Sequence, residues 1–410
     1  MKKFFLISIP LILIGLLGWW FFSKSNSPVA VILRAELPFG VPENVNIPAT
    51  TEATNDTVGQ NTSFDQSGNT DAKIFRIVNT PVAGFTILTK GGETFVRYLE
   101  RATGHIFDTR LSTLEKERVT NNTLPKVYEA YFRPDGNAVL IRSVKDGSDT
   151  VKSMILTLTP PRSASSASTS SPQASELYAV SATSVRGEVG SVVVGGGSNL
   201  FYSLKDSGAI VSSNFTSSAP KTLFSSAFTD WNLGRMGSNL LVNTRPSVSI
   251  HGYAYSLGAS GGALSKLLGP LNGLSVIANP VGSFLLYSYS DGQMHLSTKN
   301  VVKGSVLEIL PATLAEKCVW STKKVSVFFC GTPVGGLSGG EPDGWYLGQT
   351  HFTDYIWQFD TASEIAKLIS EPKAEFSLDL DISEPKLTPN EDYLVFLNHR
   401  DLTLWAVKLD

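Results

Sequence analysis

The sequence predicts an all-β protein, a β-propeller with seven blades as the expected number, behind one N-terminal transmembrane helix. Three observations predict this fold class. Residues 4–22 form an apolar run without charge. From residue 73 onward, short strand-like runs alternate with turn signals, and only residues 363–370 have helical character. A unit of strand, tight turn, strand, polar turn and strand recurs along this part of the chain.

The composition agrees with such a fold. Of the 410 residues, 42% are hydrophobic and only 17% are charged, and Ser, Thr, Asn and Gly fill the difference. Residues of these kinds suit short strands and turns better than charged surface helices. The formal net charge is -2, and the sequence contains no long basic block. Nucleic acid is therefore not an expected partner.

The N-terminal apolar run predicts the compartment. As a helix it would span about 28 Å, roughly one hydrocarbon core. Lys2 and Lys3 precede the run, whereas Lys24 follows it alone. By the positive-inside rule, residues 1–3 belong in the cytoplasm and the bulk of the chain is extracytoplasmic. We therefore expect residues 4–22 to be a single-pass signal anchor in the plasma membrane.

A cleaved signal peptide is the alternative interpretation of this run. The run is longer than the apolar region of an ordinary signal peptide, its end is bulky, and no clean small-residue cleavage site follows directly. These features favour the uncleaved anchor. Both interpretations export the rest of the chain.

The segment after the anchor, residues 23–72, is rich in Thr, Asn, Ser and Pro. Such a segment cannot bury enough apolar surface to offset the entropy lost on ordering, so we expect a disordered stalk. Residues 73–410 are the expected β-propeller domain. Within it, the central turns of the recurring unit are spaced by about 51 residues on average, close to the period of propeller blades.

A propeller explains this repetition physically. A single small sheet cannot bury both of its faces, but radial packing of several sheets buries them and protects the sheet edges. A pair of β-sandwiches is the alternative architecture.

Three of the tight turns carry a similar motif before an apolar strand. They read RPDG at residues 133–136, NPVG at residues 279–282 and TPNE at residues 388–391. These units resemble the SPDG repeats of TolB-like and WD40-like β-propellers, although the regular Gly-His and Trp-Asp signatures of WD40 repeats are missing. The resemblance implies a fold, and one fold hosts many functions.

The two cysteines, Cys318 and Cys330, flank a run that predicts a hairpin centred on Lys324. Residues that face each other on antiparallel strands lie close enough for a disulfide to join them. Since an exported domain meets an oxidising environment, we expect a structural disulfide. Two buried free thiols are the alternative.

Motifs for chemistry are weak. Ser260 and Ser338 formally match G-x-S-x-G, but neither has the strand before it and the helix after it that a hydrolase elbow needs. The five histidines have no metal-ligand spacing. Asp379 and Asp381 alternate with apolar residues, which predicts a strand with one polar face. We therefore expect no catalytic site, no metal and no cofactor.

A Gly-rich excursion at residues 331–344 leads into the candidate binding loop. Long loops carry function more often than strands do, so we expect the contact surface within residues 341–354. The candidate residues are Glu341, Asp343, Trp345, His351 and Asp354.

Together, these features predict a membrane-anchored, extracytoplasmic propeller that is more a binding scaffold of the cell envelope than an enzyme, with a protein or a glycan as its partner. The alternative is an envelope hydrolase or lyase that acts on polysaccharide at the propeller mouth. Such an enzyme needs converging carboxylates, for which Asp354 and Glu341 are the first choices.

Overall fold

The computed structural model describes residues 36–38, 72–144, 150–161, 177–218, 220–337 and 340–409. The chain divides into two units, residues 1–35 and 36–410, and the description below concerns the second. The predicted anchor at residues 4–22, and the stalk at residues 23–72 apart from residues 36–38 and 72, lie outside the described residues. Among the helices that are described, none has the length and apolar character needed to cross a membrane.

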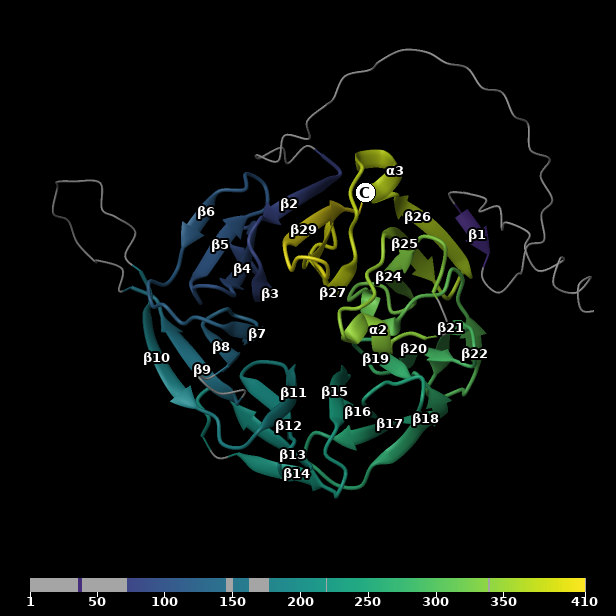
Figure 1. The fold of residues 1–410 in the computed structure, drawn as a ribbon, viewed down its shortest axis with the longest axis horizontal. Coiled ribbons are helices and arrows are strands. Elements are labelled where there is room, and N and C mark those ends of the chain that lie inside the picture. Colours follow the sequence, from purple (N-terminus) through teal and green to yellow (C-terminus); the bar gives the residue numbers. More distant parts are fainter. Residues whose placement is uncertain are drawn as a thin grey trace, which may run out of the picture. The chain divides into compact units, whose positions relative to one another are not determined.

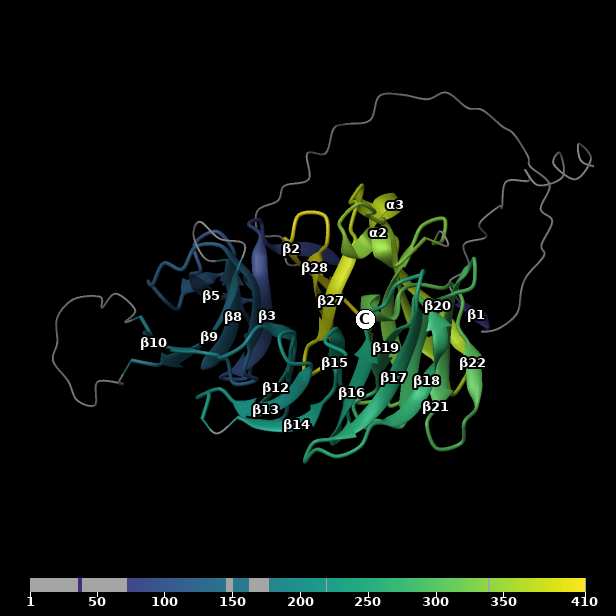
Figure 2. The same cartoon turned by 60° about the horizontal axis from the view of Figure 1, so that its bottom comes forward.

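In the described part of the chain, seven antiparallel sheets form a ring of blades around a central axis (Figure 1). The predicted all-β propeller with seven blades is therefore confirmed. Two short helices, α2 (Asp343–Tyr346) and α3 (Pro372–Phe376), lie at one end of this ring (Figure 2).

The first four blades follow one another along the chain, each beginning with its innermost strand. Blade 1 consists of β3 (Val82–Lys90), β4 (Glu93–Glu100), β5 (Ile106–Arg110) and β6 (Lys116–Arg118). Blade 2 consists of β7 (Val127–Phe132), β8 (Ala138–Val144), β9 (Val151–Thr159) and β10 (Ala179–Ser184). Blade 3 consists of β11 (Val189–Val194), β12 (Asn199–Leu204), β13 (Ala209–Asn214) and β14 (Lys221–Ser225). Blade 4 consists of β15 (Trp231–Met236), β16 (Asn239–Thr244), β17 (His251–Gly258) and β18 (Ser265–Asn272).

The remaining three blades complete the ring. Blade 5 consists of β19 (Ser275–Ala278), β20 (Phe284–Ser290), β21 (Met294–Asn300) and β22 (Val306–Glu308). The 3-10 turn η1 (Ala315–Lys317) leads into blade 6, which consists of β23 (Cys318–Trp320), β24 (Val327–Pro333), β25 (Asp354–Asp360), β26 (Ile365–Ser370) and β1 (Glu36–Pro38). Blade 7 consists of β27 (Ile382–Leu387), β28 (Tyr393–Asn398), β29 (Leu404–Lys408) and β2 (Ile74–Val78).

Strands from early in the sequence complete the last two blades. β2 pairs with β29, with Ile74 opposite Val407, so blade 7 joins the two ends of the propeller sequence. β1 pairs with β26, with Glu36 opposite Lys367, and adds a fifth strand to blade 6. This strand lies inside the segment that the sequence predicts as a stalk.

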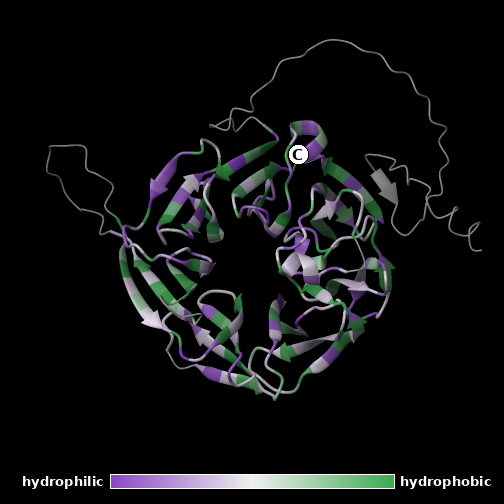
Figure 3. Ribbon diagram, in the orientation of Figure 1, coloured by the Kyte–Doolittle hydropathy of each residue, from purple (hydrophilic) through white to green (hydrophobic). Residues whose placement is uncertain are grey.

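The core lies between neighbouring blades, because inner strands are buried on both faces. Between blades 5 and 6, for example, Leu286 and Leu296 of blade 5 share one core cluster with Phe328 and Phe359 of blade 6, and all four side chains are fully buried. Hydrophobic residues recur along the strands of every blade (Figure 3). Radial packing thus buries the faces that an isolated four-stranded sheet would expose.

The motif turns have the place that the repeat predicts. They join the first and second strands of blades 2, 5 and 7, and in each the fourth residue donates its N–H to the carbonyl of the first, at 2.8–2.9 Å. Gly136 and Gly282 hold positive φ angles of 73° and 81°, which glycine adopts without strain. The resemblance to TolB-like and WD40-like repeats is confirmed at the level of the turn and the fold.

One local prediction is wrong. Residues 363–370, which have helical character in the sequence, contain strand β26. Its residues Ala366 and Ile369 are buried, Ala366 in the core cluster of blades 5 and 6 and Ile369 in a cluster made mostly of blade 7 residues. Sheet pairing and burial therefore override a weak local preference for helix.

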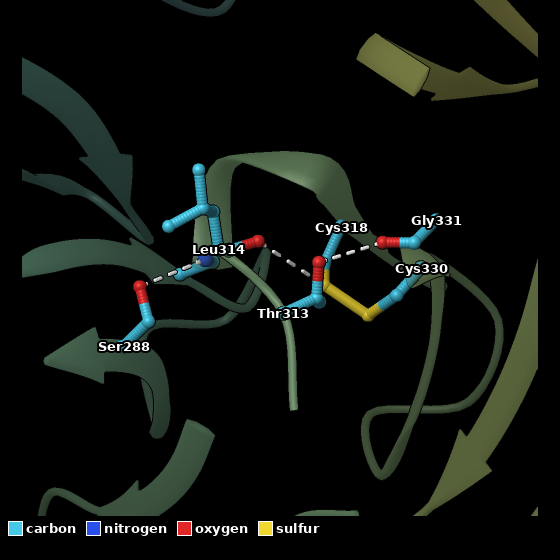
Figure 4. Close-up of a disulfide and its surroundings, with 7 residues drawn as sticks. Ser288, Thr313, Leu314, Cys318, Cys330 and Gly331 are labelled. Atoms are coloured by element: carbon cyan, nitrogen blue, oxygen red, sulfur yellow. Dashed lines mark hydrogen bonds between the residues drawn. A yellow bond between two sulfur atoms is a disulfide. The ribbon is translucent and has the colours of Figure 1, made fainter. Parts of the chain in front are cut away.

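The predicted disulfide is confirmed. Cys318 and Cys330 face each other on β23 and β24, with their Cα atoms 4.1 Å apart, and their sulfur atoms are bonded. The connecting turn is centred near Lys324, as predicted. Beside the bridge, the Thr313 hydroxyl donates to the carbonyl of Gly331 at 2.7 Å (Figure 4). The bridge and this hydrogen bond fix the start of blade 6.

Candidate functional site

The connection between β24 and β25 of blade 6 carries the candidate site. It contains α2, which lies near the centre of the ring (Figure 1) and at one end of it (Figure 2). Three cavities meet at this helix, and Tyr346 lines all of them. We call this end of the ring the mouth. The predicted contact loop, residues 341–354, forms part of it.

The first turn of this loop is held by its own acidic residues. Glu341 accepts the backbone N–H of Trp345 at 2.9 Å, and the N–H of Tyr346 donates to the carbonyl of Pro342 at 3.0 Å. The carboxylate of Asp343 accepts the backbone N–H of Val248, between β16 and β17, at 2.7 Å. The loop of blade 6 is thereby fastened to blade 4, from which blade 5 separates it along the ring.

A buried ion cluster lies beneath the loop. The ammonium of Lys317, from η1, pairs with Asp354 at 2.8 Å and with Asp381, and all three side chains are fully buried. The ammonium also lies 5.2 Å from the ring centroid of Trp345 and 5.1 Å from that of Phe352. We call Lys317, Asp354 and Asp381 the mouth cluster. It joins blade 6 to the segment that enters blade 7.

Asp381 also holds both parts of the loop. Its carboxylate accepts the indole N–H of Trp345 at 3.1 Å and the backbone N–H of Phe352 at 2.9 Å. The predicted strand with a polar face at Asp379 and Asp381 is wrong, because β27 begins only at Ile382. Asp379 does face outward, where Lys373 pairs with it at 2.6 Å.

The mouth cluster is short of positive charge. The pKa of Asp354 is raised to about 6, because burial and the charge of the Asp381 carboxylate together outweigh the Lys317 ammonium, which lowers it. One oxygen of Asp354, Oδ2, accepts the N–H of Ile382 at 2.7 Å, whereas Oδ1 is buried without a hydrogen-bond partner in the described residues. Two carboxylates thus share one ammonium.

Two histidines lie between the cluster and the surface. The ring of His399 contacts the carbonyl of Trp345 through Nε2 at 3.1 Å, and burial lowers its pKa. The His351 side chain is 35% exposed, and its Nδ1 lies 3.9 Å from Asp381. His351 and Asp354, three residues apart, therefore differ in environment, since Asp354 is fully buried.

The largest of these three cavities, which we call the mouth groove, has a volume of about 910 Å³. It lies between the loop and the turns of blades 1, 2 and 7. Its lining includes Arg101, Lys126, Tyr128, Leu347 and Arg400. A volume of this size accommodates a drug-sized molecule or a short stretch of polymer.

The other two cavities are smaller. A side pocket of about 260 Å³ lies between the loop and blade 4, and Phe228 and Ile250 line it. A chamber of about 350 Å³ lies in the central channel, where Glu129 accepts hydrogen bonds from Tyr131 and from Arg142, each at 2.7 Å. The chamber also has other charged side chains in its lining, namely Lys205, Asp230, Arg245 and Glu316.

Another carboxyl group of the chamber is Glu316, which lies beside the Tyr346 hydroxyl. Burial raises the pKa of Glu316, and burial together with the neighbouring Glu316 charge raises that of Tyr346 well above its usual range. Within the described residues, no group of three or more His, Cys, Asp or Glu side chains is arranged to hold a metal ion.

The predicted loop residues are therefore brought together, but most of them serve the loop itself. Glu341, Trp345 and Asp354 are 3%, 5% and 0% exposed. The residues that sequence reasoning missed are Lys317 and Asp381 in the cluster, together with the cations of the mouth groove. They come from different blades, so no local spacing could have linked them.

Comparison with known proteins gives the fold. No protein-family model matches the chain, and no curated protein matches it either. Oligogalacturonate lyase from Vibrio parahaemolyticus is similar in structure, with a TM-score of 0.52 and 10% identity over 82% of this chain and 93% of that one. Virginiamycin B lyase from Staphylococcus aureus has a TM-score of 0.50 and 10% identity over 82% and 98%. TolB from Acinetobacter baumannii has a TM-score of 0.39 and 12% identity over 70% and 66%. At these identities the likeness is one of fold.

Proposed function

We propose that this protein is a membrane-anchored, extracytoplasmic scaffold that binds a protein or ligand at the mouth of its propeller without catalysing a reaction. The observation that carries the proposal is a gathering of exposed apolar side chains around the mouth. Those that line the mouth groove and the side pocket are Tyr128, Phe228, Ile250 and Leu347, which are 47%, 42%, 67% and 64% exposed. Exposed apolar groups that cluster in this way are typical of interaction sites.

The rigidity of the loop supports the same function. Glu341, Asp343 and Trp345 are engaged in hydrogen bonds that hold the loop, and the mouth cluster supports it from below. Residues 347–349 at its tip are exposed. A surface that is already ordered loses less entropy on binding, so it binds a partner more tightly.

The membrane anchor and the compartment belong to the proposal as well. The apolar run at residues 4–22, with Lys2 and Lys3 before it, supports a single-pass anchor with a cytoplasmic N-terminus. The Cys318–Cys330 disulfide suits an oxidising compartment. The propeller would then face the outer side of the plasma membrane, within the cell envelope.

The alternative is an envelope hydrolase or lyase that acts on polysaccharide. One observation favours it: Glu316 has a raised pKa and lies beside the Tyr346 hydroxyl in the channel chamber, as an acid–base pair could. We prefer the scaffold because the sequence-predicted acids Glu341 and Asp354 are buried and already bonded.

The test is crosslinking of the full-length protein in its native membranes, followed by mass spectrometry. Replacement of the whole loop would break the mouth cluster, so the variant is Leu347→Asp, which changes only an exposed side chain. We expect the partner that crosslinks to the wild-type protein to be lost. The matched control is Val302→Asp, because Val302 is 88% exposed but lies in the β21–β22 turn, outside all three cavities. Equal recovery of every partner by both variants, or equal loss, would contradict the proposal.

A further inference from the structure

The mouth groove has an excess of positive charge. Its lining holds three cationic side chains, Arg101, Lys126 and Arg400, and two carboxylates, Glu129 and Asp401. Glu129 is paired with Arg142, whose guanidinium lies outside the groove, at 2.7 Å. Asp401 is the carboxylate of the lining that remains beside the two guanidinium groups of Arg101 and Arg400.

The two guanidinium groups are held by neutral partners. Arg101 donates from Nε to the carbonyl of Val127 at 3.4 Å. Arg400 donates to the carbonyl of Phe352 at 3.0 and 3.2 Å. Within the described ranges, neither guanidinium forms an ion pair with a carboxylate. These bonds position the two groups at the groove. The charge of Arg400 also helps to lower the pKa of Asp379, but that carboxylate is already paired with Lys373 at 2.6 Å.

The remaining carboxylate of the lining is occupied locally. Asp401 accepts the backbone N–H of Thr403 at 3.0 Å and the hydroxyl of Thr403 at 2.6 Å, so it closes the turn between β28 and β29. An anion that enters the groove therefore meets Arg101 and Arg400 without displacing an existing ion pair. This arrangement favours a negatively charged occupant.

The apolar lining indicates what kind of anion fits. Leu347 is an aliphatic side chain that is 64% exposed, and it has no aromatic face on which a sugar ring could stack. Tyr128 has the Arg101 guanidinium over its ring, 5.0 Å from the centroid. Aliphatic contact beside guanidinium groups suits a peptide that alternates apolar and acidic side chains.

We infer that the mouth groove binds an acidic, extended peptide segment of a partner protein. Carboxylates of the segment would pair with Arg101 and Arg400, and an apolar side chain would pack on Leu347 and Tyr128. This inference rests on the proposed scaffold function and names the chemistry of its partner.

The test uses the full-length protein in detergent and three fluorescent peptides with the same leucine spacing. The acidic peptide repeats Asp-Glu-Leu, the neutral one Ser-Gln-Leu and the basic one Lys-Lys-Leu. We expect fluorescence anisotropy to report at least about tenfold tighter binding of the acidic peptide than of the other two. Added salt should weaken this binding, because screening reduces the attraction between charges at the surface.

Charge reversal locates the site. The double variant Arg101→Glu with Arg400→Glu should weaken binding of the acidic peptide by about tenfold or more. The matched control is Lys303→Glu with Lys324→Glu, which makes the same change in net charge at exposed turns away from the mouth. Arg101→Gln with Arg400→Gln is a further variant that keeps amide donors for the two backbone carbonyls, so a loss of binding there reports charge rather than misfolding.

The inference is overturned if the three peptides bind equally well. It is also overturned if the Arg101→Glu with Arg400→Glu variant binds the acidic peptide as well as its Lys303→Glu with Lys324→Glu control does. A partner that depends on Leu347 in crosslinking, combined with peptides that bind without regard to charge, would leave the scaffold function standing and remove this inference. Absence of any Leu347-dependent partner would instead remove the scaffold function.

Discussion

Two ion clusters in this propeller, each around a buried carboxylate, have opposite balances of charge. In blade 1, Arg97 and Lys90 share a single carboxylate, Asp108, which accepts two hydrogen bonds from Arg97 at 2.7 Å. In the mouth cluster, a single ammonium, Lys317, is shared by two carboxylates, Asp354 and Asp381. We call the first the blade 1 cluster.

The carboxylates of the two clusters respond in opposite directions. Burial favours the neutral form of Asp108, but the hydrogen bonds and charges of Arg97 and Lys90 outweigh it and hold the pKa of Asp108 below its usual value. Burial raises the pKa of Asp354 to about 6, and its one cation does not compensate. The balance of charges within a buried cluster therefore decides whether its carboxylate stays ionised.

The two clusters also have different structural roles. The third hydrogen bond of Arg97 goes to the carbonyl of Gly136 at 3.0 Å, so the blade 1 cluster fastens blade 1 to the first turn of blade 2. The mouth cluster fastens a loop that presents exposed side chains. The blade 1 cluster, which joins two blades, pairs its one carboxylate with two cations. The mouth cluster, which supports the proposed binding loop, has two carboxylates and one ammonium.

The largest expected effect comes from removing the central cation of each cluster. Lys317→Met leaves two buried carboxylates without a cation and should lower the free energy of unfolding by about 3–5 kcal/mol. Arg97→Met should cost less, because Asp108 keeps Lys90 at 2.5 Å. Urea unfolding of both variants measures the difference. A milder effect for Lys317→Met than for Arg97→Met would refute the proposed imbalance.

A smaller effect is expected from the disulfide, since Cys318 directly follows Lys317 and holds its backbone. The bridge closes a loop with a sequence separation of 12. Cys318→Ala with Cys330→Ala should lower the free energy of unfolding by about 2–3 kcal/mol, through the entropy of the unfolded chain. The control is a reducing agent, which should destabilise the wild-type protein and leave the variant unchanged. Equal sensitivity of the two proteins to reduction would argue against this account.

A third effect concerns the pH dependence of stability, and it sharpens the comparison most directly. The folded-state pKa of Asp354, about 6, exceeds the ordinary value of 3.8, so the folded state binds a proton before the unfolded state does. This carboxyl group therefore adds stability as the pH falls from above 6 towards 4, and the gain disappears as the pH rises through about 6. Asp354→Asn should remove this part of the dependence in unfolding measured across that range.

Asp108→Asn provides the opposite control. Because the pKa of Asp108 is lowered, its contribution to stability is present above the ordinary Asp value and is lost only in stronger acid. In the Asn variant, the free energy of unfolding should therefore no longer decline in strong acid through this group, and its pH dependence between about pH 4 and 6 should be unchanged. If the two Asn variants alter the pH dependence of stability over the same pH range, the clusters do not differ as described.

Much of the fold could be predicted from the sequence because its signals are local. The RPDG turn at residues 133–136 encodes its own hydrogen bond and the positive φ of Gly136. The spacing of Cys318 and Cys330 around one turn encodes their pairing. Where the local signal was weak, as in residues 363–370, the prediction failed because sheet pairing decided the structure.

The candidate site could be predicted only in part. The Gly-rich excursion before residue 345 indicated a long loop, and that loop does lie at the mouth. The roles of its acidic residues could not be predicted from the sequence. Glu341 and Asp354 were expected to contact a ligand, but they form bonds within the protein.

The sequence by itself determined the repeat, its turns, the disulfide and the position of one long loop, since each depends on residues close together in the chain. Only the tertiary structure decided that Lys317 meets Asp354 and Asp381, and that Arg101 and Arg400 line one groove. The physical reason is ring closure. Packing the blades around an axis brings charges from distant segments within a few ångströms, and no local pattern records which of them will meet.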